Sequence, residues 1–164
     1  MYKAFNKMTD NSRVWFFQST EFLEYEKVER ISARLLNFLE GWEAHGKPLQ
    51  ASFTILHDWF IAVALDEESY QATGCSIDKL TRQIQSLETE LKVSLTDRTG
   101  IAYRDHNGLI QTMHMVNFRA AMESGEFDES TIVFNNLIET KGQVKDEWEV
   151  PVARSWHKQW LPVA

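Results

Sequence analysis

The sequence predicts an α+β fold, with a mostly antiparallel sheet and two long helices packed on one of its faces. Two segments carry the three- and four-residue apolar spacing of amphipathic helices, and two pairs of β-prone segments are joined by connections too short for a parallel crossover. The 164 residues are 43% hydrophobic, which is enough for a sizeable core. We expect a single domain over residues 1–164. The alternative is a βαββα core unit at 1–96 with a C-terminal extension or subdomain at 97–164.

The first half begins with a strand that leads into a helix. Arg13–Gln18 is a short run of β-prone residues, and Ser19 and Thr20 follow it as candidate N-caps. The helix is expected from about Thr20 to Glu40, and Gly41 ends it. Its apolar stripe consists of Val28, Ile31, Leu35, Phe38 or Leu39, and Trp42.

Two further strands and a second helix complete the first half. Ser52–His57 and Trp59–Leu65 are so close in sequence that we expect an antiparallel hairpin turning at His57 and Asp58. The second of these strands is apolar throughout, as expected of a central strand covered on both faces. The second helix follows Ser76 as N-cap. Its stripe consists of Ile77, Leu80, Ile84, Leu87 and Leu91. The resulting βαββα order suits a ferredoxin-like split unit.

A β-hairpin opens the second half. Ile101–His106 and Leu109–Met115 flank Asn107-Gly108, the preferred pair for a type I′ turn, in which both central residues have positive φ. In that register one face carries Ile101, Tyr103, Asp105, Ile110, Thr112 and His114. Neither face alternates cleanly enough to identify the buried one.

A helix, a strand and a tail follow the hairpin. The helix is expected around Asn117–Ser124 and ends at Gly125, and Thr131–Phe134 is expected to form a strand. The tail, Lys141–Ala164, is expected to be irregular, with one short helix starting near Ser155.

Charge and composition exclude several classes of partner. The 17 Lys and Arg residues are outnumbered by 24 Asp and Glu, and the net charge of -7 repels a nucleic-acid backbone. The start of the chain lacks the apolar core of a secretion signal, and the longest apolar run, Trp59–Leu65, is too short to span a bilayer. A single cysteine, Cys75, agrees with a reducing compartment. We expect a soluble cytoplasmic protein that neither binds nucleic acid nor inserts into a membrane.

One segment resembles a phosphate-binding P-loop. Gly41–Lys47 fits its first seven positions, but Pro48 stands where a Ser or Thr must hold magnesium. A helix precedes the segment and a strand follows it, the reverse of the required order. Ile61–Glu67 is similar to a Walker B strand, in which Asp66 would be the magnesium ligand. Any buried strand that ends in a charged turn has this pattern, so nucleotide binding is the third and least favoured interpretation.

The catalytic candidates are Cys75, Ser76 and Asp78, at the start of the second helix. A helix N-terminus favours a thiolate, so Cys75 would be the nucleophile. Catalysis would also need a base, brought by the fold from His57, His106 or His114. In the alternative, Ser76 caps the helix and Cys75 is a small buried hydrophobic residue.

The binding candidates are Trp148, Trp156 and Trp160, three of the six tryptophans. Exposed, they would form a platform for a peptide or a sugar, because aromatic side chains dominate interaction hot spots. Buried, they would anchor the tail, with Trp156 and Trp160 one helical turn apart. The five histidines lack metal-ligand spacing and one cysteine cannot build a zinc site, so we expect no metal and no cofactor.

Several motifs give the chain a family resemblance. They are Thr73–Lys79, Ala102–Arg104, Thr131–Leu137, Trp148–Pro151 and Ser155-Trp156. On these motifs, the chain resembles, over nearly its whole length, a family of small bacterial proteins of uncharacterised function that often carry the label "ABC transporter ATPase". The residues do not support that label, because the complete P-loop and the Leu-Ser-Gly-Gly-Gln signature of such ATPases are missing. The resemblance implies no activity for named residues.

A second, fainter similarity concerns residues 117–136. Their order of helix, Gly125 and Thr131–Phe134 is similar to that of GYF-like adaptor modules, and this resemblance implies binding of proline-rich peptides. The leading interpretation is therefore a non-catalytic binding or interaction module whose partner is an unidentified protein, peptide or small molecule. A thiol-dependent enzyme that uses Cys75 is the alternative.

Overall fold

The computed structural model describes residues 1–163, and the chain divides into two compact units. Unit 1 contains Met1–Thr96 together with Glu139–Gly142, and unit 2 contains the described residues of 97–138 and 143–163. Both units combine antiparallel sheets with helices, so the predicted α+β class is confirmed. Among residues 1–163, no helix combines the length and apolar character needed to cross a membrane.

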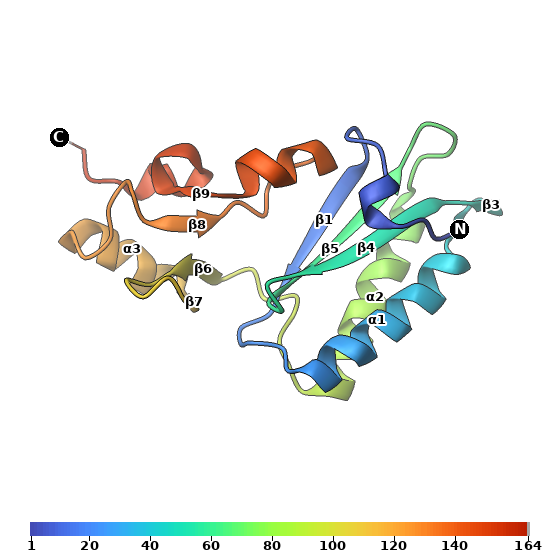
Figure 1. The fold of residues 1–164 in the computed structure, drawn as a ribbon, viewed down its shortest axis with the longest axis horizontal. Coiled ribbons are helices and arrows are strands. Elements are labelled where there is room, and N and C mark those ends of the chain that lie inside the picture. Colours follow the sequence, from blue (N-terminus) through green and yellow to red (C-terminus); the bar gives the residue numbers. More distant parts are fainter. Residues whose placement is uncertain (164) are drawn as a thin grey trace. The chain divides into compact units, whose positions relative to one another are not determined.

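Unit 1 is a three-stranded sheet with two long helices on one face (Figure 1). Its strands are β1 (Arg13–Gln18), β4 (Gln50–Leu56) and β5 (Phe60–Asp66), in the antiparallel order β1-β5-β4. Its helices are α1 (Tyr25–Glu40) and α2 (Gly74–Leu91). Both helices share one core with β5, to which α1 contributes Ile31, Leu35 and Leu39, α2 contributes Leu80, Ile84 and Leu87, and β5 contributes Ile61, Val63 and Leu65. The predicted position of two helices on one face is confirmed.

The central strand β5 is buried on both of its faces. Every residue from Phe60 to Leu65 is 0% exposed, which explains why this strand is apolar without alternation. β4 and β5 pair up to Leu56 and Phe60, so the predicted hairpin is confirmed. His57 and Asp58 turn this hairpin with φ values of 55° each.

A segment from late in the chain extends this sheet beyond β1. Lys141 N donates to Ser12 O (2.8 Å), Val14 N donates to Glu139 O (3.0 Å), and Arg13 forms an antiparallel bridge with Thr140. In a ferredoxin-like unit the fourth strand lies at this edge, antiparallel to the first strand. The βαββα order of the first half is therefore completed by residues far away in sequence.

The P-loop-like segment is a small hairpin. β2 (Glu43–Ala44) pairs with β3 (Lys47–Pro48), and His45 and Gly46 connect them with φ values of 51° and 73°. Positive φ at both central residues is the geometry of a type I′ turn. This arrangement lacks the helix that must follow a phosphate-binding loop.

Unit 2 is a four-stranded antiparallel sheet of order β7-β6-β8-β9, accompanied by one α-helix and several short helices (Figure 1). Its strands are β6 (Gly100–Arg104), β7 (Ile110–His114), β8 (Ile132–Phe134) and β9 (Glu149–Pro151). The α-helix of unit 2 is α3 (Met115–Ser124), and its short helices are η3 (Val144–Trp148), η4 (Val152–Arg154) and η5 (Trp156–Trp160). A further short helix, η2 (Lys141–Gln143), begins in unit 1. Strand β9 was not predicted, because three residues are too few to give a periodic signal.

The hairpin of unit 2 has a different turn from the one predicted. Only Gly108 has positive φ, at 78°, and Gly108 N donates to Asp105 O (2.9 Å), which indicates a type I turn followed by a glycine bulge. The Asp105 carboxylate favours this turn, because its Oδ1 accepts hydrogen bonds from the backbone N–H groups of Asn107 (2.9 Å) and Leu109 (3.0 Å).

The change of turn shifts the register by one residue. Tyr103 pairs with Gln111 and Ile101 with Met113, so the predicted set of Ile101, Tyr103, Asp105, Ile110, Thr112 and His114 on one face is wrong. The buried face instead carries Ile101, Tyr103 and Met113, which pack against Phe118 and its neighbours.

Both long helices begin at other residues than predicted. α1 begins at Tyr25 rather than Thr20, because the Ser19 Oγ accepts from Glu21 N (3.1 Å) and Leu23 N donates to Asp58 O (2.7 Å), which holds residues 19–23 outside the helix. α2 begins at Gly74, two residues before the predicted cap.

Two glycines of unit 1 allow the effect of backbone conformation to be measured without a change in packing. A Cβ added at Gly46 or at Gly74 would meet no atom within 4 Å, but only Gly46 has positive φ. We predict that Gly46→Ala lowers the free energy of unfolding by about 1 kcal/mol. Gly74→Ala, in the first turn of α2, should raise it by about 0.5 kcal/mol, because alanine restricts the unfolded chain. Urea unfolding of both variants measures this; a change of the same sign in both would contradict the turn geometry.

Candidate functional site

The start of α2 exposes Cys75 and uses Ser76 as a cap partner. Thr73 is the N-cap: its Oγ1 accepts from Ser76 N (3.2 Å), and Thr73 N donates to Ser76 Oγ (2.8 Å). The prediction of Ser76 as the N-cap is therefore wrong, because Thr73 is the N-cap and Ser76 is its partner in a reciprocal capping box. The Ser76 hydroxyl is buried and forms part of this cap. Cys75 and Asp78 are exposed, so the interpretation of Cys75 as a small buried residue is wrong.

His57, a candidate base that belongs to unit 1, lies far from Cys75. His57 is in the turn before β5, whereas Cys75 follows the other end of that strand. Seven residues of extended strand span about 20 Å. His106 and His114 belong to unit 2. No hydrogen bond to the Cys75 thiol is formed within the described part of the chain. The thiol is thus accessible, and unit 1 does not bring His57 to it.

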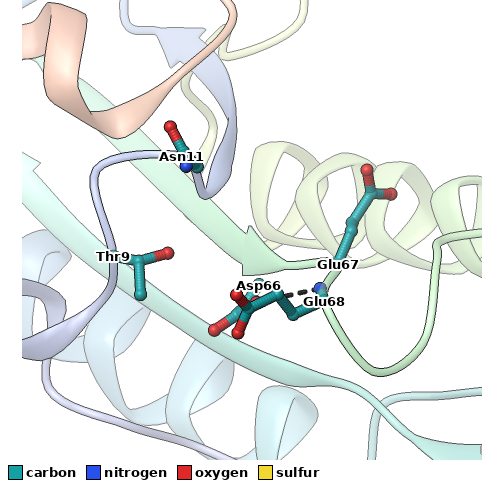
Figure 2. A pocket seen from close by; sticks show the side chains of 5 residues that line it. All are labelled: Thr9, Asn11, Asp66, Glu67 and Glu68. Carbon is teal, nitrogen blue, oxygen red and sulfur yellow. Dashed lines mark hydrogen bonds between the residues drawn. The ribbon is translucent and has the colours of Figure 1, made fainter.

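A shallow acidic hollow lies at the end of β5, where the Walker B-like run ends (Figure 2). Its volume is about 320 Å³, and it is lined by Thr9, Asn11, Asp66, Glu67 and Glu68. Asp66 Oδ1 accepts from Glu68 N (3.0 Å), as the dashed line in Figure 2 shows. The Glu67 side chain points away from Asp66 (Figure 2), and its Oε1 accepts from Ala72 N (3.0 Å). Across residues 1–163, no three His, Cys, Asp or Glu side chains lie together in a way that could hold a metal ion. The magnesium role considered for Asp66 from sequence stays a prediction.

Unit 2 contains an aromatic cluster that sequence spacing did not reveal. We define it as Tyr103, Phe118, Phe127, Trp156, His157 and Trp160. Phe118, on α3, is 0% exposed and lies at the centre. Its ring centroid is 5.2 Å from that of Phe127 and 6.0 Å from those of Tyr103 and Trp160. The side chains of Tyr103, Phe127, Trp156 and Trp160 remain partly exposed.

The three tryptophans singled out in the tail have two different environments. Trp148 is 3% exposed, its indole Nε1 donates to Asn136 Oδ1 (2.9 Å), and its ring lies 5.0 Å from that of Phe134. Trp156 and Trp160 meet edge to face at 5.0 Å on η5, as their spacing of one helical turn predicts. Trp148 is thus buried in unit 2, whereas Trp156 and Trp160 remain partly exposed.

His157 lies inside the aromatic cluster as a neutral ring. It is 2% exposed and stacks on Trp156 at 4.0 Å, and its Nδ1 lies 2.6 Å from the Oγ of the buried Ser155. Burial lowers the pKa of His157 to about 4. The Ser155–His157 pair resembles part of a catalytic dyad, but its hydroxyl is enclosed in the core and cannot meet a substrate there.

The comparisons with known proteins identify no functional residue. No family model, curated protein or solved structure matches the chain. The aromatic cluster is therefore assessed on its geometry and charge.

His157 should make unit 2 sensitive to acid. Its pKa is lower in the folded state than in the unfolded state, where it is about 6.5, so the unfolded chain takes up the proton first. We predict that this group leaves the free energy of unfolding unchanged above about pH 6.5 and lowers it as pH falls towards 4, by up to about 3 kcal/mol. Urea unfolding, followed by NMR signals of unit 2, measures this dependence.

The matched control for this prediction is His157→Phe in a Ser155→Ala background, which keeps an apolar ring and removes the titrating group. The difference between wild type and control isolates His157 from the carboxylates Asp97, Asp105 and Asp128, whose pKa values hydrogen bonding lowers from 3.8. Those carboxylates change the free energy of unfolding mainly at pH values below the range over which His157 does so. Identical slopes in wild type and control between pH 6.5 and 4 would show that His157 is not buried as described.

Proposed function

We propose that the chain is a non-catalytic binding module whose partner docks on the partly exposed rings of the aromatic cluster. One observation carries this proposal: four aromatic side chains from three separate segments of unit 2 stay partly exposed around the buried Phe118. Aromatic rings supply a large contact area at a low cost in conformational entropy, and they are enriched where binding energy concentrates.

A protein or peptide segment is the partner class that this surface suits best. The four rings belong to β6, to the turn after α3, and to η5, so a ligand that touches all of them must extend across several elements of unit 2. Half-buried rings spread over several elements favour a chain-like ligand. We also propose a cytoplasmic location, with which the exposed, unpaired thiol of Cys75 agrees. Membership of the small bacterial family stays a prediction.

The test is a selection of random peptides displayed on phage against the full chain. We expect selected peptides to shift the NMR signals of Tyr103, Phe127, Trp156 and Trp160, and we expect Trp156→Ala to weaken their binding about tenfold or more. Trp59→Ala is the matched control, because Trp59 is a partly exposed tryptophan of unit 1.

Two results would contradict the binding proposal. One is that no peptide is enriched, and the other is that the shifted signals lie outside the aromatic cluster. If Trp156→Ala fails to fold, the chemical-shift map on the wild-type chain decides the matter without it.

A thiol-dependent enzyme is the second candidate, and one observation favours it: Cys75 is exposed in the first turn of an 18-residue helix. If α2 activates the thiol, iodoacetamide should alkylate Cys75 faster in the native chain than in the chain unfolded by urea at the same pH. A native rate equal to or below the unfolded rate would end this candidate. Ser155 lies beside His157, but we do not propose it as a nucleophile because it is buried.

A further inference from the structure

The Tyr103 end of the aromatic cluster is negatively charged, and this bears on the chemistry of the partner. The carboxylates of Asp105 and Glu126 both act on the Tyr103 hydroxyl: burial raises the pKa of Tyr103, and these two charges raise it further. The ring of Tyr103 lies 4.8 Å from that of Phe127, the residue after Glu126. Two aromatic rings thus meet at 4.8 Å on unit 2, and the charges of Asp105 and Glu126 act on one of them.

The pKa of Asp105 is lowered by the hydrogen bond from Leu109 N and, to a smaller extent, by the charge of the neighbouring His106. Within residues 1–163, no Lys, Arg or His side chain forms an ion pair with Asp105 or Glu126. The same holds for Asp128 and Glu129, which continue the acidic turn beside Phe127. Nearby arginines are already engaged: Arg104 pairs with Glu149 (3.0 Å) and Arg119 with Glu123 (3.3 Å).

The two ends of the aromatic cluster differ in charge. Asp105 is held in place, since its Oδ1 accepts two backbone N–H groups of its turn and its Oδ2 accepts from Gln111 Nε2 (3.2 Å). The η5 segment also carries Lys158, an exposed cation that follows Trp156 by two residues in sequence. A cationic ligand group is therefore attracted to the Tyr103 end and repelled from the η5 end.

We propose that an arginine or lysine side chain of a partner peptide binds on Tyr103 and Phe127, with its charge between the carboxylates of Asp105 and Glu126. The aromatic faces receive the cation and its alkyl stem, and the carboxylates accept its N–H groups. This inference rests on the proposed binding function and names its ligand class, a basic peptide. Apolar neighbours of that basic residue then contact Trp160 and Trp156.

The experiment is an NMR titration of the full chain with acetyl-Gly-Arg-Gly-amide. The matched probe is the same peptide with citrulline, which keeps the shape of the arginine side chain and removes its charge. We expect the arginine peptide to cause saturable shifts at Tyr103, Phe127 and Glu126, and the citrulline peptide to bind at least fivefold more weakly. Glu126→Gln should weaken binding of the arginine peptide about two- to fivefold, as expected for one exposed charge pair. Glu68→Gln, which removes the same charge from unit 1, should leave it unchanged.

Three outcomes would overturn the inference: no saturable shift, equal binding of the citrulline peptide, or equal effects of Glu126→Gln and Glu68→Gln. The third would mean that only the overall negative charge attracts the probe. Failure here is distinguishable from failure of the proposed function. If displayed peptides bind the aromatic cluster but carry no excess of Arg and Lys, the binding module stands and its ligand class is different.

Discussion

The path of the chain depends on a short contact between Glu139–Gly142 and β1. Gly142 N donates to Asp10 O (2.9 Å), and a Cβ at Gly142 would lie 3.0 Å from the Asp10 Cβ and 3.2 Å from its carbonyl oxygen. A larger residue at this position would therefore require Asp10 to move by a few tenths of an ångström. Because the segment completes unit 1 and interrupts the sequence of unit 2, no single cut in the chain separates the two units. Unit 2 is thus built from two stretches of the chain that flank this segment.

Local signals in the sequence predict much of the fold. Strand β1 has the predicted bounds, the stripe of α2 is buried at Leu80, Ile84 and Leu87, and the apolar run of β5 marks a central strand. The errors come from interactions that the sequence pattern does not show. The Asp105 carboxylate selects the turn of the β6–β7 hairpin and so moves its register by one residue. The place of Glu139–Gly142 on β1 depends on contacts over more than 100 residues of sequence, which no periodicity records.

The candidate site was predictable only in part. The spacing of Trp156 and Trp160 predicts their contact, but the excess of tryptophan fits a buried anchor as well as an exposed platform. Tyr103 and Phe127 could not be identified, because they join the aromatic cluster through Phe118 on a helix between them in sequence. Placing Tyr103 on the buried face also needed the true register of the hairpin. His157 illustrates the same limit, since a histidine among polar tail residues gives no sign that it is buried as a neutral ring.

Unit 2 thus combines a buried aromatic centre with an exposed aromatic edge, and that combination is the basis of the binding account. The most direct test is to record intermolecular NOEs between a selected peptide and the full chain labelled on its aromatic rings. The account predicts NOEs from the peptide to ring protons of Phe127, Trp156 and Trp160, and none to the buried Trp148. NOEs confined to residues of unit 1 would contradict it.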